Sequence, residues 1–101
     1  MAMVLVKNAK SAGTITVMKP RILVVEDEPA ISEPLAESLE REGFEVEVAP
    51  TVETAREAYG RQPPDLMLLD VMLPDGDGRD LAREIRRDSD VPIIKIGRAH
   101  V

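Results

Sequence analysis

Two unbroken runs of apolar residues, each closed by acidic residues, constrain the fold of this chain more than any other feature. Residues 22–25 are followed by Glu26 and Asp27, and residues 66–69 are followed by Asp70. Apolar runs of this length without polar alternation are typical of strands buried on both faces of a parallel sheet. Because α/β proteins bind ligands at the carboxyl ends of such strands, the sequence predicts a cluster of carboxylates at one edge of a central sheet.

The first helix and the strand after it are predicted from their periodicity. Ile31, Leu35 and Leu39 recur at the spacing of one helical face, and Gly43 is placed to end that helix. Residues 44–49 alternate between apolar and acidic side chains. This period of two predicts a strand with one solvent-facing side, at an edge of the sheet.

The remaining elements continue the alternation of strands and helices. Thr51 is expected to cap a second helix that ends at Gly60, and a third helix is predicted around Leu81 and Ile85. Residues 91–94 are predicted to form a fourth core strand. The order β-α-β-α-β-α-β predicts an α/β fold with a parallel sheet and right-handed crossovers.

The two ends of the chain do not fit this pattern. Residues 1–18 are expected to be a leader outside the domain, and the alternative is a hairpin with a polar turn at residues 8–13. Residues 95–101 resemble the translation of a sequencing-library adapter, so we expect an artefactual tail and assign no function to its side chains. The predicted domain therefore comprises residues 19–94.

Composition narrows the class of protein. The chain has 101 residues, enough for one small domain, and it is 44% hydrophobic and 32% charged, as globular domains are. A formal net charge of −6 disfavours binding of this chain to nucleic acid or to anionic membranes. The absence of cysteine excludes thiolate metal sites and is compatible with a cytoplasmic location. No stretch approaches the ~20 apolar residues that a membrane-spanning helix needs.

The predicted carboxylate cluster needs a counter-charge. Glu26, Asp27 and Asp70 would meet if the two buried strands are neighbours. Like charges at roughly 4–6 Å repel by about a few kcal/mol per pair at an effective dielectric constant near 20. A divalent cation offsets this repulsion, and an all-oxygen ligand set favours Mg²⁺ or Mn²⁺ over zinc. A carboxylate beside such a cation is suited to attack phosphorus and form an acyl phosphate.

Four other acidic residues receive structural interpretations. Glu28 lies where the first helix begins, and negative charge is favourable at that end of a helix. Asp75 and Asp77 each precede a glycine, which is typical of turns. Asp65 is interpreted as a loop residue at the start of a strand.

Two segments carry a resemblance to a known family. Residues 25–29 read Val-Glu-Asp-Glu-Pro at the end of the first buried strand. Residues 65–78 contain the second buried run, its aspartate and the loop Leu-Pro-Asp-Gly-Asp-Gly. With this separation the two segments resemble the receiver domain of bacterial two-component response regulators, from about residue 19 to residue 94.

The resemblance assigns roles to individual residues. It implies that Asp70 is the phospho-acceptor and that Mg²⁺ is held by Glu26, Asp27, Asp70 and the backbone carbonyl group of Met72. The phosphoryl group would come from a sensor histidine kinase. A receiver of this kind is a signalling switch and not an enzyme with a small-molecule substrate.

The resemblance also implies a fold and a parent protein. Receivers are flavodoxin-like, doubly wound parallel sheets of order 2-1-3-4-5, so we expect the incomplete order 2-1-3-4 without the fifth βα unit. The place of the family's phosphoryl-sensing Ser or Thr falls near Gly97. The segments look most like receivers that precede a winged-helix domain, so DNA would be bound only through a missing C-terminal output domain. Whether the parent is a homodimer stays open, and we expect phosphorylation of this fragment to be impaired.

Two other classes of function are weighed against this interpretation. A Mg²⁺-dependent phosphoryl-transfer enzyme also places carboxylates at strand ends. However, the Asp-x-Asp patterns of haloacid-dehalogenase-like phosphatases and of topoisomerase-primase domains are absent around Glu26 and Asp70. A structural α/β module would keep the acidic residues without binding metal. Turnover of a phosphomonoester would identify the first alternative, and failure to accept a phosphoryl group would identify the second.

Overall fold

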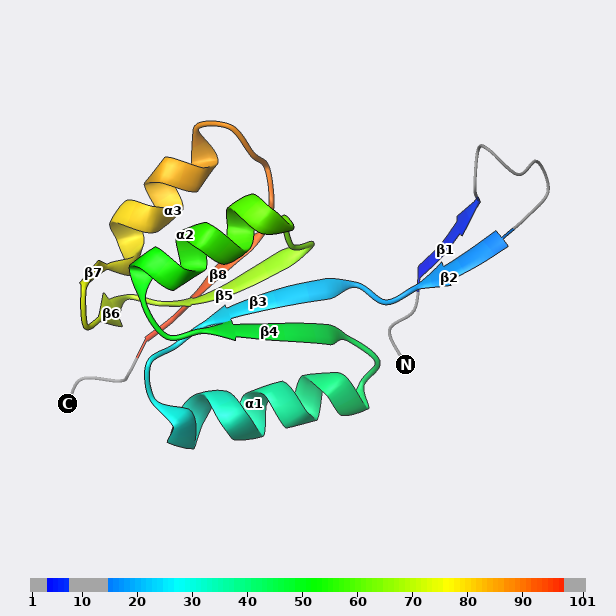
Figure 1. Ribbon diagram of the computed structural model, residues 1–101, viewed down its shortest axis with the longest axis horizontal. Helices are drawn as coiled ribbons and strands as arrows, with labels where there is room; N and C mark the ends of the chain where they lie inside the picture. Colours follow the sequence, from blue (N-terminus) through cyan, green and yellow to red (C-terminus); the bar gives the residue numbers. More distant parts are fainter. Residues whose placement is uncertain (1–3, 8–14, 98–101) are drawn as a thin grey trace.

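A computed structural model describes residues 4–7 and 15–97 of the chain (Figure 1). The elements follow in the order β1 (Val4–Lys7), β2 (Ile15–Met18), β3 (Arg21–Val25), α1 (Pro29–Arg41), β4 (Glu45–Ala49), α2 (Val52–Arg61), β5 (Leu66–Asp70), β6 (Met72–Leu73), β7 (Gly76–Asp77), α3 (Gly78–Arg86) and β8 (Ile93–Ile96). The alternation of strands and helices predicted from residue 21 onwards is confirmed. The two-residue strands β6 and β7, which pair in the loop after β5, were not predicted.

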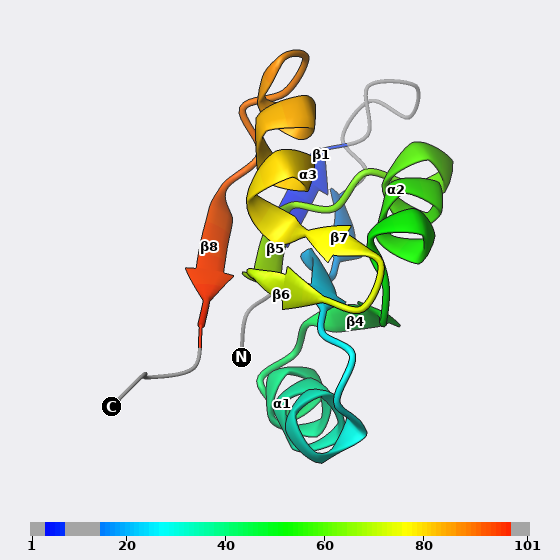
Figure 2. The ribbon, with the colours of Figure 1, turned by 90° about the vertical axis from the view of Figure 1, so that its left-hand side faces the viewer.

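The central sheet has four parallel strands in the order β4-β3-β5-β8. Numbered from the first strand of the domain, this is the predicted order 2-1-3-4, with the acidic-apolar strand β4 at one edge as expected. Helix α1 covers one face of the sheet, and α2 and α3 cover the other (Figures 1 and 2). The predicted flavodoxin-like α/β fold is therefore confirmed.

The strand registers bring the ends of the core strands to one edge of the sheet. Val25 pairs with Leu69 in β5 and with Ala49 in β4. Strand β8 begins later than predicted and continues to Ile96, which pairs with Asp70 at the end of β5. The last two residues of β8 thus lie in the segment expected to be a tail, because the parallel ladder continues as far as β5 does.

Two glycines behave differently at the ends of helices. Gly43 adopts a positive φ of 99° after α1, which confirms its predicted role in ending that helix. The prediction that Gly60 ends α2 was wrong, because the helix continues through Gly60 to Arg61. Gln62 is extended instead, as expected for a residue that precedes a proline.

Buried residues form two clusters, one on each face of the sheet. The cluster under α2 and α3 contains Leu23, Val25, Ala49, Ala55, Ala58, Met67, Leu69, Leu81, Ala82 and Ile85. The cluster on the α1 face contains Ile22, Val24 and Leu68, with half-buried side chains such as Leu35 and Leu39 packed against it. The two clusters share the central strands β3 and β5, so the sheet separates them.

The amino-terminal residues form a separate two-stranded unit. Strands β1 and β2 pair in antiparallel fashion and belong to a sheet of their own. The structure therefore has the two strands of the hairpin alternative, and the predicted turn at residues 8–13 lies outside the described residues. That residues 1–18 are a leader outside the domain stays a prediction. Figure 1 shows the pair beyond the amino-terminal end of β3, away from the helices. No helix in the described part of the chain has the length and apolar character needed to cross a membrane.

Candidate metal and phosphoryl site

The predicted carboxylate cluster forms at the carboxyl ends of β3 and β5. Glu26 and Asp27 directly follow β3, and Asp70 is the last residue of the neighbouring strand β5. One carboxylate oxygen from each residue lies within 4.8 Å of the others. Glu26 and Asp70 are each only 3% exposed, and Asp27 is half-buried. The two strand ends therefore place the three side chains together, as the sequence predicted.

Hydrogen bonds from the backbone orient two of these carboxylates. The N–H group of Glu28 donates to Oε2 of Glu26 at 3.1 Å. The N–H group of Met72 donates to Oδ1 of Asp70 at 3.1 Å. Burial raises the pKa of Glu26, and the negative charge of Asp70 adds to this effect although the Glu28 N–H group opposes it. The ionised form of Glu26 is therefore disfavoured at this site, and a positive charge bound nearby would favour it.

Two buried oxygens of the cluster accept no hydrogen bond from the described residues. They are Oδ1 of Asp27 and Oδ2 of Asp70. A buried acceptor without a partner is costly, so such atoms in native proteins usually receive a ligand, an ion or water. Because all the donor atoms are oxygens and two of them are unsatisfied, the residues fit a hard divalent cation such as Mg²⁺ or Mn²⁺.

A tightly turned loop leads from Asp70 to α3. The N–H group of Gly78 donates to the carbonyl oxygen of Val71 at 2.7 Å. A Cβ atom at Gly78 would lie 2.2 Å from the backbone oxygen of Asp70, a separation that no side chain tolerates. Glycine at this position is therefore required for α3 to begin directly beside the end of β5.

Met72 lies in this loop, two residues after Asp70. The residue is 68% exposed, and its N–H group donates to the Asp70 carboxylate. The assignment of its carbonyl oxygen as a metal ligand stays a prediction.

The other acidic residues have the structural roles that were expected, with one addition. Glu28 is the N-cap residue of α1, and Asp77 is the N-cap residue of α3 and accepts from the N–H group of Arg79 at 2.8 Å. Asp65 accepts from the N–H group of Arg21 at 2.7 Å. Asp75 contacts the distant helix α2 and not only its own turn. Sequence reasoning missed this contact, since nothing local to Asp75 signals a partner on another element.

The residues that form this site lie in a segment that matches a known protein family. Residues 22–100 match the family model of the response regulator receiver domain. The chain belongs to the response regulator receiver domain family. Receiver domains are parts of two-component response regulators, which confirms the resemblance drawn from the two acidic segments.

Curated relatives include transcriptional response regulators. The transcriptional regulatory protein BaeR of Escherichia coli O6:H1 is 48% identical over 81 residues, which are 76% of this chain and 32% of that protein. The DNA-binding response regulator MtrA of Mycolicibacterium smegmatis is 44% identical over 79 residues, which are 78% of this chain and 35% of that protein. This chain therefore spans about a third of the length of these curated relatives.

Solved receiver domains share the fold. The non-phosphorylated receiver domain of HemR from Leptospira biflexa superposes with a TM-score of 0.74 at 40% identity, over 82% of this chain and 68% of that one. The BeF3-activated N-terminal receiver domain of RstA from Klebsiella pneumoniae gives a TM-score of 0.75 at 36% identity, over 80% and 69% of the two chains.

Proposed function

We propose that Asp70 accepts a phosphoryl group and that Glu26, Asp27, Asp70 and the carbonyl oxygen of Met72 hold Mg²⁺ or Mn²⁺ beside it. The observation that supports this proposal is the meeting of three carboxylates at the ends of β3 and β5, with one buried Asp70 oxygen that has no hydrogen-bond partner among the described residues. Membership of the receiver family supports the same reaction.

The two oxygens of Asp70 have different tasks in this proposal. Oδ1 accepts from the Met72 N–H group, which fixes the rotation of the carboxylate. Oδ2 accepts no hydrogen bond from the described residues, so its lone pairs are available both to a cation and to phosphorus, and we assign it as the nucleophile. It attacks the phosphorus of a phosphohistidine; the P–N bond breaks, its electron pair returns to the imidazole, and an acyl phosphate forms on Asp70. A bound divalent cation supplies the positive charge that offsets repulsion between the carboxylate and the incoming phosphoryl group.

The partners proposed for the parent protein follow from its relatives. A sensor histidine kinase is the phosphoryl donor in this proposal. Since BaeR is named as a transcriptional regulatory protein and MtrA as a DNA-binding response regulator, we propose that the parent regulates transcription through an output domain, in the cytoplasm. The receiver itself acts as a switch in this scheme and has no substrate to turn over.

Intact-mass measurement after incubation with acetyl phosphate and Mg²⁺ tests the proposal. Because phosphorylation of this fragment is expected to be impaired, only a minor fraction of the unmodified sequence is expected to gain the mass of one phosphoryl group, and Asp70→Asn is expected to gain none. Asp88→Asn is the matched control, since it makes the same change in the turn after α3 and no hydrogen bond or ion pair of its side chain is present among the described residues. An adduct on Asp70→Asn, or steady hydrolysis of a phosphomonoester, would contradict the proposal.

A further inference from the structure

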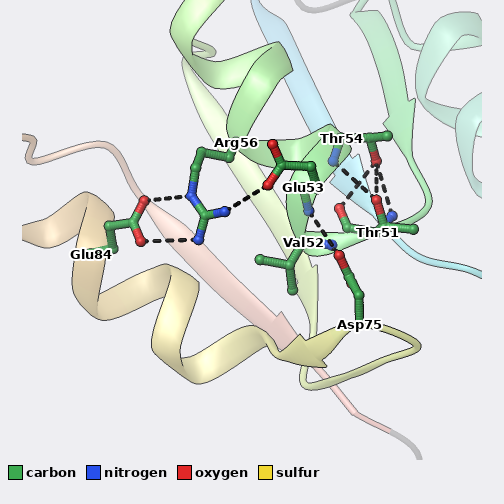
Figure 3. A network of polar contacts seen from close by, with 7 residues as sticks. All are labelled: Thr51, Val52, Glu53, Thr54, Arg56, Asp75 and Glu84. Atoms are coloured by element: carbon green, nitrogen blue, oxygen red, sulfur yellow. Dashed lines mark hydrogen bonds and ion pairs between the residues drawn. The ribbon is translucent and has the colours of Figure 1, made fainter.

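The carboxylate of Asp75 links the loop after β5 to the amino end of α2. Its Oδ1 accepts from the N–H group of Val52 at 2.8 Å, and its Oδ2 accepts from the N–H group of Glu53 at 3.1 Å. Figure 3 shows both contacts, with Asp75 reaching from the β6–β7 turn to the first residues of the helix. The two elements are joined although Asp75 lies 23 and 22 positions from its partners in the sequence.

Asp75 completes the capping of α2. The first N–H groups of a helix have no partner within the helix. Thr51 and Thr54 form a capping box, in which Oγ1 of Thr51 accepts from the Thr54 N–H group at 3.0 Å. The N–H groups of Val52 and Glu53 remain, and both donate to Asp75. The helix therefore has a local cap from its own segment and a second cap from the loop.

The same loop carries the backbone groups beside the phospho-acceptor. At one end the Met72 N–H group donates to Asp70, and at the other the Gly78 N–H group donates to the Val71 carbonyl oxygen. Between them β6 and β7 pair over only two residues each. A pair this short is weak alone, so the two hydrogen bonds of Asp75 to α2 add an anchor from outside the loop.

We propose that Asp75 is a positioning residue, which ties the loop after β5 to α2 and thereby holds the backbone of Met72 in place for cation binding beside Asp70. The inference rests on the proposed function, because it concerns the same site. The N–H group of Val52 is the main cause that lowers the pKa of Asp75, so the carboxylate is ionised and accepts both hydrogen bonds at neutral pH. Negative charge at the amino end of a helix is favourable in itself.

Mg²⁺ affinity, measured by calorimetric titration of the full chain, tests this role. Asp75→Ala is expected to weaken binding about tenfold, the lower end of the effect of removing a group that orients a ligand. Asp75→Asn keeps one acceptor oxygen and is expected to lie between Asp75→Ala and the unmodified sequence. Thr51→Ala is the matched control, since it removes the other cap of the same helix without detaching the loop, and it is expected to leave the affinity unchanged.

Amide hydrogen exchange without metal provides a second measurement. Faster exchange at Val52 and Glu53 in both Asp75 variants is expected, together with the loss of affinity. Equal affinity of Asp75→Asn and the unmodified sequence would overturn the inference, and so would an equal loss in Thr51→Ala, which would mean that only the stability of α2 matters. If Asp75→Ala does not fold, Asp75→Asn carries the comparison. An unmodified sequence that binds no Mg²⁺ would instead contradict the proposed function, and the inference with it.

Discussion

The two faces of the central sheet are covered to different extents. Ten buried apolar residues form the cluster on the face under α2 and α3, while α1 alone lies over the other face, where three apolar residues are buried. Within α1 itself only Ser32 is buried, whereas Leu35 and Leu39 are half-buried. Val48 and Ile94 remain 38% and 52% exposed on that face. One helix is too narrow to cover four strands, so the α1 face retains exposed apolar surface.

Ion pairs among the described residues also involve α2 and α3 and not α1. Arg56 of α2 donates from Nε and Nη2 to the carboxylate of Glu84 in α3, at 2.8 and 3.1 Å, and it also pairs with Glu53 (Figure 3). Arg61 of α2 pairs with Glu47 of β4. No ion pair among the described residues involves α1. The α2–α3 face thus combines the larger buried apolar cluster with ion pairs at its edge, and we expect it to unfold last.

The largest difference is expected from Leu69→Ala and Leu68→Ala, two neighbours on β5 that point to opposite faces. Leu69 is fully buried under α2 and α3, so its truncation is expected to lower the free energy of unfolding by about 3–4 kcal/mol. Leu68 is 9% exposed on the α1 face, where the expected loss is about 2 kcal/mol. Urea unfolding monitored by circular dichroism measures both. Equal losses would show that the two faces are equally well packed.

The order of strands and helices could be predicted because it depends on local patterns. Residues 22–25 and 66–69 are apolar throughout. A strand that is buried on both faces requires apolar side chains at every position. The difference between the faces could not be predicted from the same runs, since it depends on how many helices share each side. The end of α2 was predicted wrongly because Gly60 was interpreted as the residue that ends the helix. The prolines after Gln62 end it instead.

A smaller difference is expected within β8. Ile93 packs against the α2–α3 cluster, and Ile94 points to the other face with 52% of its surface exposed. Ile93→Thr is expected to cost about 1–2 kcal/mol of unfolding free energy, because it places a hydroxyl group in an apolar environment. Ile94→Thr is expected to change stability by less than about 0.5 kcal/mol and to reduce light scattering at high concentration. A larger cost for Ile94→Thr would show that the α1 face is covered in solution.

The smallest effect on stability is expected when the Asp77 carboxylate, which pairs with Arg79 at the start of α3, is titrated with acid. The Arg79 side chain, aided by the Arg79 N–H group, lowers the pKa of Asp77 from 3.8 to about 2. A folded-state pKa below the unfolded value means that the stabilisation is present above about pH 3.8 and is lost as the pH falls towards 2. Carboxyl-carbon NMR of Arg79→Ala is expected to show the Asp77 pKa moving up towards 3.8, with Arg79→Lys in between. An unchanged Asp77 pKa in Arg79→Ala would show that this ion pair does not stabilise the ionised Asp77 side chain.

The meeting of Glu26, Asp27 and Asp70 was predictable because parallel strands end at one edge of the sheet. The role of Asp75 was not, because its partners are N–H groups at Val52 and Glu53, and every residue other than proline carries such a group. Sequence patterns identify side chains with unusual chemistry more readily than contacts to the backbone of a distant element.

The close approach of Gly78 to the backbone oxygen of Asp70 fixes the distance between the end of β5 and the first turn of α3. In a library that varies every codon of the loop, we expect the folded chains to carry only glycine at this position and several different residues at the neighbouring positions. Chains with an insertion between the two residues should also fail this selection, since an extra residue would move glycine away from its position beside the backbone of Asp70. The number of residues between Asp70 and Gly78 is therefore expected to be fixed by the same steric contact that requires glycine.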